Sequence, residues 1–189
     1  MSHAPAAPLR WVVVMGLMAT GKTTVGRAIA ERLGWSHSDS DETIEAETGQ
    51  TVAELQRQIG DDAMHEREAR HLLKALSGPR RTVVSAAASI IDDDRCLAAL
   101  DRPAVIGIWL CSSSEVLAQR LAEGGHRPAF GQDPVAVLTE QARARDPRYA
   151  AHSAITIAID GRAVDEVVTL AMQALRQRAG LDGGRTGDG

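Results

Sequence analysis

The chain has 189 residues, of which 44% are hydrophobic and 3% aromatic, and its formal net charge is −4. This length favours one compact α/β domain over two, and the mild negative charge gives no general reason to expect nucleic-acid binding. No apolar run approaches the roughly 18 residues that a membrane helix needs, and the isolated Cys96 and Cys111 argue against a disulfide framework or structural zinc. We therefore expect a cytoplasmic protein that binds neither membrane nor nucleic acid.

Short β-branched apolar runs alternate with amphipathic segments along the whole chain. Such runs indicate buried strands, and apolar residues at helical spacing indicate helices. The expected strands are residues 10–15, 35–39, 81–86, 103–111 and 154–159. The expected helices are residues 23–33, 41–48, 51–59, 62–76, 91–100, 113–122, 134–147 and 164–178. This alternation predicts an α/β fold whose five-stranded parallel sheet is covered by helices on both faces.

The composition also predicts where the domain begins and ends. A disordered leader is expected at residues 1–9, one folded domain at 10–179 and a disordered Gly-rich tail at 180–189. Residues 123–133 read EGGHRPAFGQD, with four glycines or prolines among charged side chains, and are expected to form a loop.

The first predicted strand leads directly into Gly16-x-x-x-x-Gly21-Lys22-Thr23. This is the P-loop pattern, in the strand–loop–helix setting in which backbone N–H groups and a helix N-terminus surround phosphate oxygens. Lys22 supplies charge to the β- and γ-phosphates, and the Thr23 hydroxyl can ligate Mg²⁺. The sequence thus predicts binding of ATP and Mg²⁺. The expected nucleotide-binding residues of the loop are Gly16, Ala19, Thr20, Gly21, Lys22, Thr23 and Thr24.

A carboxylate partner for the metal is expected at the end of a strand, as in other P-loop proteins. The third and fourth strands end VVSAAAS and IWLCSSS, so neither offers one. Asp39, at the end of the second strand, is the best-placed candidate to share the metal with Thr23. The alternative is that Asp39 and Asp41 only cap the helix that follows, a position that favours aspartate.

These motifs resemble the shikimate kinase family of small P-loop kinases, which phosphorylate a ring hydroxyl. The resemblance covers about residues 10–175 and rests on the P-loop, on SDSDETIE with the downstream TGQTVAEL, on HRPAF and on RDPRY. It implies a three-layer α/β/α fold like that of nucleoside monophosphate kinases, with strand order 2-3-1-4-5. It also implies substrate-binding helices at about 40–76 and a short lid at 123–133.

The resemblance further implies a catalytic role for three residues, Lys22, Asp41 and Arg127. Lys22 would hold the phosphates, and Arg127 in HRPAF would close over the transferring phosphoryl group. Asp39 would hold Mg²⁺ through water, while Asp41 would bind the acceptor hydroxyl and orient or deprotonate it. Asp39 and Asp41 would then have separate functions.

Three further arginines fall at family positions that contact a ligand. Arg120 and Arg162 lie where the family contacts adenine. Arg145, in RDPRY, lies where the family grips the carboxylate of its substrate.

Two stretches depart from the family pattern on the acceptor side. Where the family has G-E-x-x-F-R-x-x-E, this chain reads GDDAMHERE, with His65 in the arginine position. A histidine has one donor to offer there instead of an arginine fork, and it loses its charge near neutral pH. The family's three glycines after the third strand are here Ala86, Ala87 and Ala88, which add methyl groups and disfavour positive φ. We expect these four residues to line the acceptor site, although His65 could equally lie on a helix face without contacting the substrate.

The expected activity is transfer of the ATP γ-phosphate to a hydroxyl of a small polyol or sugar acid, by a monomer. A gluconate-kinase-like enzyme is one alternative, and a nucleotide-binding regulator that has lost catalysis is another. Retention of Lys22, Asp41 and Arg127 argues against the regulator. A nucleoside monophosphate kinase is disfavoured because the predicted lid is short and few arginines are available for a second phosphate.

Overall fold

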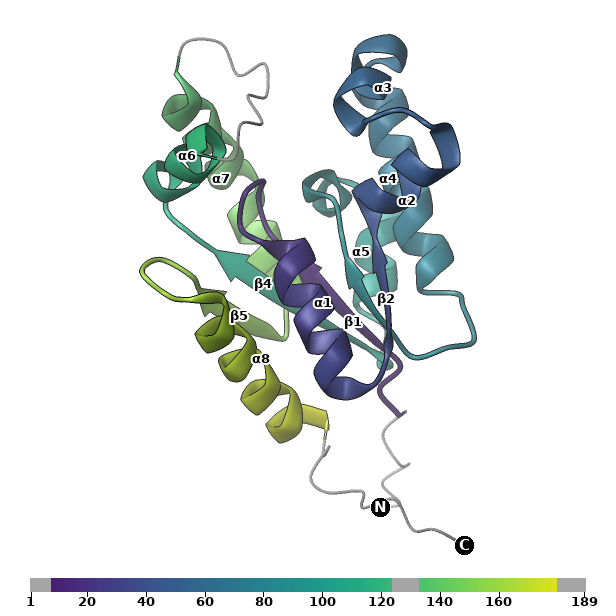
Figure 1. Cartoon of the computed structure of the whole chain (residues 1–189). Coiled ribbons are helices and arrows are strands. Elements are labelled where there is room, and N and C mark those ends of the chain that lie inside the picture. Colours follow the sequence, from purple (N-terminus) through teal and green to yellow (C-terminus); the bar gives the residue numbers. More distant parts are fainter. Residues whose placement is uncertain (1–7, 124–132, 180–189) are drawn as a thin grey trace, which may run out of the picture.

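A computed structural model of the chain describes residues 8–123 and 133–179 (Figure 1). The predicted leader and tail therefore lie almost entirely outside the described residues. The strands are β1 (Trp11–Met15), β2 (Ser36–Asp39), β3 (Thr82–Ser85), β4 (Val105–Cys111) and β5 (Ile155–Ala158). The helices are α1 (Lys22–Leu33), α2 (Ser40–Thr48), α3 (Val52–Ile59), α4 (Asp61–Ala75), the 3₁₀ helix η1 (Ala88–Asp92), α5 (Asp94–Leu100), α6 (Ser114–Glu123), α7 (Pro134–His152) and α8 (Val164–Ala179).

The five strands form one sheet in the order β2-β3-β1-β4-β5, and every neighbouring pair is parallel. The predicted strand order is confirmed. Because all strands run the same way, their carboxyl ends meet at one edge of the sheet, and the loops that leave them converge there. The P-loop follows β1, the central strand, so that it lies in the middle of this edge.

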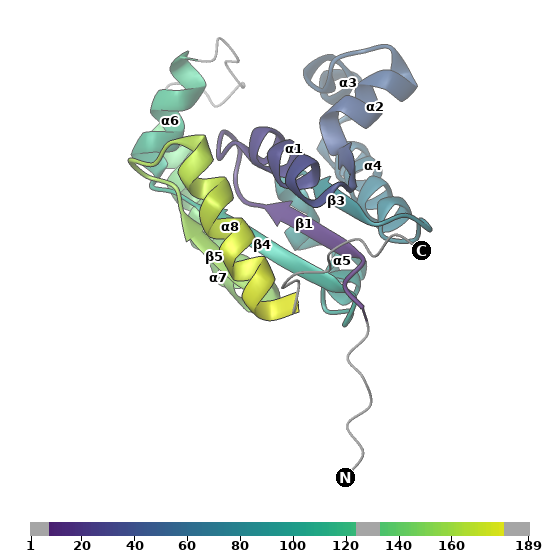
Figure 2. The same ribbon diagram turned by 60° about the horizontal axis from the view of Figure 1, so that its bottom comes forward.

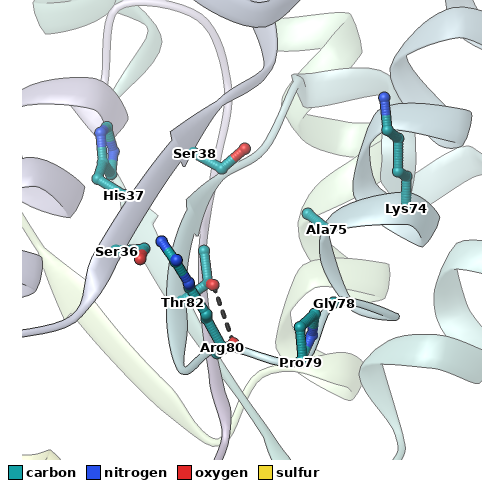
Figure 3. A pocket seen from close by; sticks show the side chains of 9 residues that line it. All are labelled: Ser36, His37, Ser38, Lys74, Ala75, Gly78, Pro79, Arg80 and Thr82. Atoms are coloured by element: carbon teal, nitrogen blue, oxygen red, sulfur yellow. Dashed lines mark hydrogen bonds between the residues drawn. The ribbon is translucent and has the colours of Figure 1, made fainter.

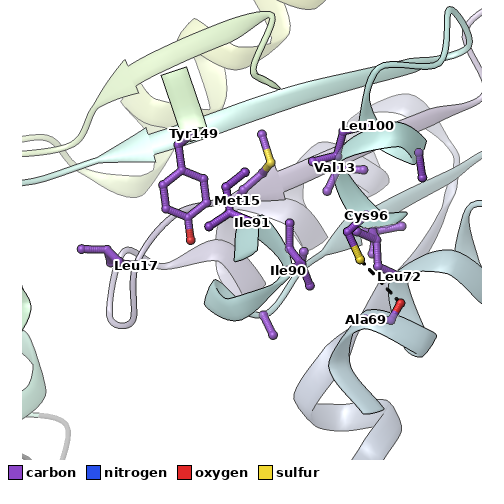
Figure 4. Close-up of a cluster of buried hydrophobic side chains, with 14 of the residues drawn as sticks. Val13, Met15, Leu17, Ala69, Leu72, Ile90, Ile91, Cys96, Leu100 and Tyr149 are labelled. Atoms are coloured by element: carbon purple, nitrogen blue, oxygen red, sulfur yellow. Dashed lines mark hydrogen bonds between the residues drawn. The ribbon is translucent and has the colours of Figure 1, made fainter. Parts of the chain in front are cut away.

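Both faces of the sheet are buried, which explains the uninterrupted apolar runs of the strands. Val12 and Val14 of β1 pack with residues of α1 and α8, which cover the same face in Figure 2. Val13 and Met15 face the opposite layer, which is built from α4, α5 and α7. Figure 4 shows Met15 in this layer beside buried residues that include Leu72 of α4 and Tyr149 of α7. The three-layer α/β/α architecture is confirmed.

Helices α2, α3 and α4 extend the fold beyond the carboxyl edge of β2. They share a small cluster of their own, with Ile44, Leu55 and Met64 buried together. This cluster is separate from both main cores. The helices expected at about 40–76 are therefore present.

Two helix boundaries differ from the sequence prediction. The helix expected to end at Pro147 continues to His152, with the proline inside it. Tyr149 explains the continuation: it is fully buried, its ring stacks on Trp109 with centroids 5.9 Å apart, and its hydroxyl donates to the Ala88 carbonyl at 2.8 Å. These contacts offset the cost of a proline in a helix interior.

The helix expected at 91–100 is instead two elements, η1 and α5. Asp93 separates them, because its side chain accepts hydrogen bonds from the backbone N–H groups of Arg95 and Cys96 and thus caps α5. No helix of the described ranges is long and apolar enough to cross a membrane.

Helix α1 approaches β3 closely at Gly26. A Cβ at this position would meet Ser85 Oγ far inside contact distance and would lie 3.2 Å from His37 Nε2. Ser85 Oγ itself donates to the Lys22 carbonyl at 3.0 Å and contacts His37 Nε2 at 2.9 Å. Ser85 thus links the end of β3 to the first turn of the P-loop helix.

We predict that Gly26→Ala lowers the free energy of unfolding by about 1–2 kcal/mol, because overpacking outweighs the helix propensity that alanine gains. Ser85→Ala removes the obstructing oxygen. In that background the same Gly26→Ala change should be neutral or stabilising. Urea unfolding of the four proteins in this cycle measures the effect, and an equal loss in both backgrounds would contradict the packing explanation.

Candidate active site

The P-loop has the backbone conformation that its glycines permit. Gly16 has φ 146°, and a Cβ there would lie 2.5 Å from the Leu110 carbonyl oxygen, while Gly21 has φ 84°. Ala19, at φ 64°, is the one non-glycine residue with positive φ among the described residues. Left-handed backbone at alanine costs about 1–2 kcal/mol, so the loop is locally strained, as binding loops often are.

Lys22 lies over this loop, where its Nζ donates to the Leu17 carbonyl at 2.9 Å. Burial lowers the pKa of Lys22, and the nearby carboxylates of Asp41 and Asp39 oppose that shift. The ammonium group is therefore close to both predicted functional carboxylates. Thr20, whose hydroxyl also donates to the Leu17 carbonyl at 2.9 Å, helps to hold the loop in shape.

Asp39 connects the P-loop helix to α2. Its Oδ2 accepts from the Thr23 hydroxyl at 2.7 Å, and its Oδ1 accepts from the backbone N–H groups of Asp41 at 3.0 Å and Glu42 at 3.2 Å. The residue is 5% exposed. The two interpretations of Asp39 in the sequence are thus compatible, because one oxygen caps α2 while the other faces the predicted metal ligand Thr23.

Asp41 is the second residue of α2, two residues after the end of β2. Its side chain reaches solvent, yet the protein atoms packed around it raise its pKa, and the neighbouring Asp39 carboxylate adds to the shift. Lys22 opposes the shift. A carboxyl group with a raised pKa, next to a lysine and just after a strand, is a candidate general base.

The residues predicted on the acceptor side lie on or next to α4, η1 and α7. On α4, His65 is exposed, while Glu68 accepts a hydrogen bond from the Ser89 hydroxyl, and burial raises the pKa of Glu68. On α7, the Arg145 side chain is 16% exposed and pairs with Asp92. The charges of Arg145 and Asp41 both act on Glu68, which places all three around one region.

The three alanines after β3 differ from expectation. Ala86 and Ala87 are 2% and 7% exposed and pack in the core, and only Ala88 is half-buried. None of the three has positive φ, and Ala87 has φ −61°. Alanine is therefore accommodated in this turn without strain, because the backbone adopts a conformation that any residue can take.

The arginines predicted near adenine both lie on the β4–β5 side of the P-loop. Arg120 of α6 reaches the loop, where its NH1 donates to the Ala19 carbonyl at 3.5 Å. Arg162 is exposed after β5, and its side chain donates to the Ala158 carbonyl. Thr24, in the first turn of α1, is exposed. Arg127 and residues 124–132 of the predicted lid lie outside the described residues.

Asp92 and Asp160 are two carboxylates whose contacts at this edge the sequence did not indicate. Asp160 joins the β5–α8 loop to the β4–α6 loop by accepting from the Ser113 backbone N–H at 3.0 Å and from the Ser112 hydroxyl. Asp92 belongs to the run DDD, which is typical of a solvated helix start, and its contacts with Arg145 and Arg148 distinguish it.

A cavity of about 320 Å³ lies elsewhere in the described part of the chain. It is formed between β2 and the end of α4 and is lined by Ser36, His37, Ser38, Lys74, Ala75, Gly78, Pro79, Arg80 and Thr82 (Figure 3). No P-loop residue lines it, so it is not the reaction site. Within the described residues no group of three or more His, Cys, Asp or Glu side chains could hold a metal by itself. A metal at Thr23 and Asp39 would thus need ligands from the nucleotide and from water.

Comparison with known proteins agrees with this geometry. The family model for shikimate kinase matches residues 18–176. A shikimate kinase from Symbiobacterium thermophilum is 35% identical over 170 residues, which cover 88% of this chain and 97% of that protein. A shikimate kinase from Streptomyces coelicolor is 31% identical over 90% of this chain and 96% of its own length.

Solved structures give the same result. The structure of shikimate kinase from Acinetobacter baumannii in complex with shikimate has a TM-score of 0.83 and 28% identity, and the match covers 89% of this chain and 94% of that one. A gluconokinase from Sinorhizobium meliloti, with a TM-score of 0.63 and 24% identity over 92% of this chain and 96% of that one, shares the fold alone. With a family model matched over most of its length and relatives covered almost end to end, the chain belongs to the shikimate kinase family.

Proposed function

We propose that the chain transfers the γ-phosphate of ATP to a hydroxyl of a small polyol or sugar acid of shikimate size. The observation that carries this proposal is the position of Asp41, close enough to Lys22 for their charges to act on each other and directly after the Thr23–Asp39 pair. A base beside the phosphate-binding lysine can orient an acceptor hydroxyl for in-line attack. Most of the acceleration then comes from positioning and electrostatics, as in other phosphoryl transfers.

The residues present suit a magnesium-bound nucleotide. Thr23 and Asp39 offer hard oxygen donors 2.7 Å apart, the ligand type that Mg²⁺ prefers, and they lie at the end of the phosphate-binding loop. When bound there, the ion would neutralise charge on the transferring phosphoryl group. Lys22 would hold the β- and γ-phosphates, Arg120 and Arg162 would lie beside the base, and Arg127 would act from the lid.

On the acceptor side, Arg145 is the cation that would hold a carboxylate, with His65 and the half-buried Ala88 beside it. Asp41 would align the hydroxyl and take its proton as the oxygen attacks phosphorus. The raised pKa of Asp41 suits this task, since a base is most effective when its pKa approaches the working pH.

Measurement of ADP release against shikimate, gluconate and a panel of neutral polyols tests the proposal. We expect one acceptor to stimulate ADP release well above the ATPase background, and that acceptor identifies the substrate. ATP binding without stimulation by any acceptor would contradict the proposal and would favour a nucleotide-binding regulator.

His65→Arg is expected to lower the KM for a carboxylate-bearing acceptor about tenfold while changing kcat little. The exposed position tolerates the larger side chain, and a charge-assisted hydrogen bond contributes about 1.5–3 kcal/mol. His65→Gln, which lacks the charge, is the matched control. Steady-state kinetics at fixed saturating ATP measure the effect, and equal KM values in all three proteins would mean that position 65 does not contact the acceptor.

A further inference from the structure

Asp92, the last residue of η1, carries a carboxylate that the proposed mechanism does not use. Its Oδ2 accepts a hydrogen bond from Nε of Arg145 at 2.8 Å and lies 2.7 Å from NH2 of the same side chain, as an ion pair. Its Oδ1 lies 4.0 Å from NH1 of Arg148, one helical turn further along α7. One carboxylate thus contacts two arginines that project from the same face of a helix.

The contact fixes how the guanidinium of Arg145 is turned. Asp92 occupies the edge that carries Nε and one N–H of NH2, and NH1 makes no hydrogen bond within residues 8–123 and 133–179. A guanidinium held along one edge by an acid keeps its other edge, with parallel N–H donors, for a second carboxylate. The side chain is 16% exposed, so little of it remains free to move.

The two elements that carry Asp92 and Arg145 are joined by buried contacts. Tyr149 of α7 is fully buried, and its hydroxyl donates to the carbonyl of Ala88, the first residue of η1. Asp92 ends this same short helix, and Arg145 lies one turn before Tyr149 on α7. The positions of the acid and the arginine are thus fixed to each other through buried contacts.

From this geometry we propose that Asp92 is a positioning residue of the acceptor site, which turns the free edge of Arg145 toward the carboxylate of the acceptor. The inference rests on the proposed function, in which Arg145 holds that carboxylate. The orientation of Arg145 matters more here than in a site with two arginines, because the His65 side chain cannot make a second two-pronged contact with the carboxylate. Orientation of Arg145 is then the main determinant of selectivity for an anionic acceptor.

Two substitutions separate position from charge. Asp92→Glu keeps the negative charge but displaces it by a methylene group, and Asp92→Asn keeps the size but removes the charge. If Asp92 acts by position, both should raise the KM for the acceptor by about five- to tenfold, the cost of re-ordering a free arginine side chain at each binding event. The values of kcat and of KM for ATP should stay within about twofold of wild type, a conservative margin for a residue that contacts neither reacting group.

The matched control is Asp94→Asn. Asp94 is two residues away, its side chain is 93% exposed, and among the described residues it pairs only with Arg148, at 3.3 Å. This variant should leave both KM values unchanged. In an Arg145→Ala background, Asp92→Asn should have no further effect on KM, because the residue through which it acts is gone.

The probes are shikimate and its methyl ester, or gluconate and gluconamide if the wild type prefers gluconate. The rise in KM should appear with the acid and disappear with the neutral analogue, which a general loss of structure would not produce. If no acceptor of the panel stimulates ADP release, the proposed function itself fails. If the wild type phosphorylates only neutral polyols, the acceptor has no carboxylate for Arg145 to hold, and the role of Asp92 is overturned while the proposed function stands. If the wild type phosphorylates an acid and Asp92→Glu leaves the KM unchanged, or the acid and neutral acceptors are affected alike, the role of Asp92 is likewise overturned while the proposed function stands.

Discussion

Asp41→Asn is expected to reduce acceptor phosphorylation by about 10²–10⁴-fold, the usual contribution of a positioned general base. ATP binding should remain nearly intact, because Lys22, Thr23 and the loop glycines do not depend on the Asp41 side chain for their contacts. Asparagine keeps the size of the side chain and can still hydrogen-bond the acceptor hydroxyl. What it loses is the ability to take the proton.

Single-turnover kinetics at saturating ATP, together with titration of a fluorescent ATP analogue, separate these two effects. A variant that turns over normally would remove Asp41 from the mechanism, and one that no longer binds ATP would make Asp41 part of the nucleotide site instead. Asp41→Glu is a useful companion, because it keeps a base but displaces it and should recover only part of the rate.

Asp41→Asn is also expected to change the free energy of unfolding in a way that depends on pH. The pKa of Asp41 is raised in the folded protein, so ionisation of this carboxyl destabilises the fold relative to an uncharged side chain. This loss of unfolding free energy is absent below the unfolded-state pKa of about 3.9, and it grows as the pH rises through the pKa that Asp41 has in the folded protein. The Asn variant should therefore be the more stable protein at neutral pH, and its advantage should shrink as the pH falls.

The second large effect is expected at Asp39, where the outcome depends on which substitution is made. Asp39→Asn keeps an acceptor for the N–H groups of Asp41 and Glu42, and asparagine caps helices about as well as aspartate. It removes the charge beside Thr23. The apparent affinity for Mg²⁺ should fall about 10–100-fold, as when partners of metal ligands are replaced, while stability stays within about 1 kcal/mol.

Asp39→Ala removes the cap as well. It leaves the Thr23 hydroxyl and two backbone N–H groups in a buried place without their acceptor, which should cost about 2–3 kcal/mol of unfolding free energy. Urea denaturation and the Mg²⁺ dependence of ADP release, measured on both variants, distinguish the two functions of Asp39. Equal stability of the Asn and Ala variants would show that the cap contributes nothing, and an unchanged Mg²⁺ dependence would remove Asp39 from the metal site.

The fold was largely predictable because its signals are local or periodic. The apolar runs of β1 and β4 are buried on both faces, and the glycines of the P-loop occupy backbone conformations that few other residues can adopt. The order of the strands came from the resemblance of motifs, since no local pattern specifies which strand neighbours which.

What the sequence did not predict depends on contacts between distant segments. Arg145 and Asp92 are 53 residues apart, and nothing in the run DDD distinguishes the acid that binds an arginine from the one that caps α5. The helix through Pro147 is likewise held by the burial of Tyr149, which overrides the local tendency of proline to end a helix. In both cases contacts between distant segments, and not the local sequence, decided the outcome.

The central claim is that an acceptor hydroxyl beside Asp41 receives the γ-phosphate. Incubation of the wild-type protein with γ-labelled ATP and the acceptor that most stimulates ADP release, followed by mass spectrometry of the small molecules, tests it most directly. We expect the label on the acceptor, one label for each ADP formed, and transfer about 10²–10⁴-fold slower with Asp41→Asn. Label found only in inorganic phosphate would contradict the account, because the site would then hydrolyse ATP without transferring its phosphoryl group.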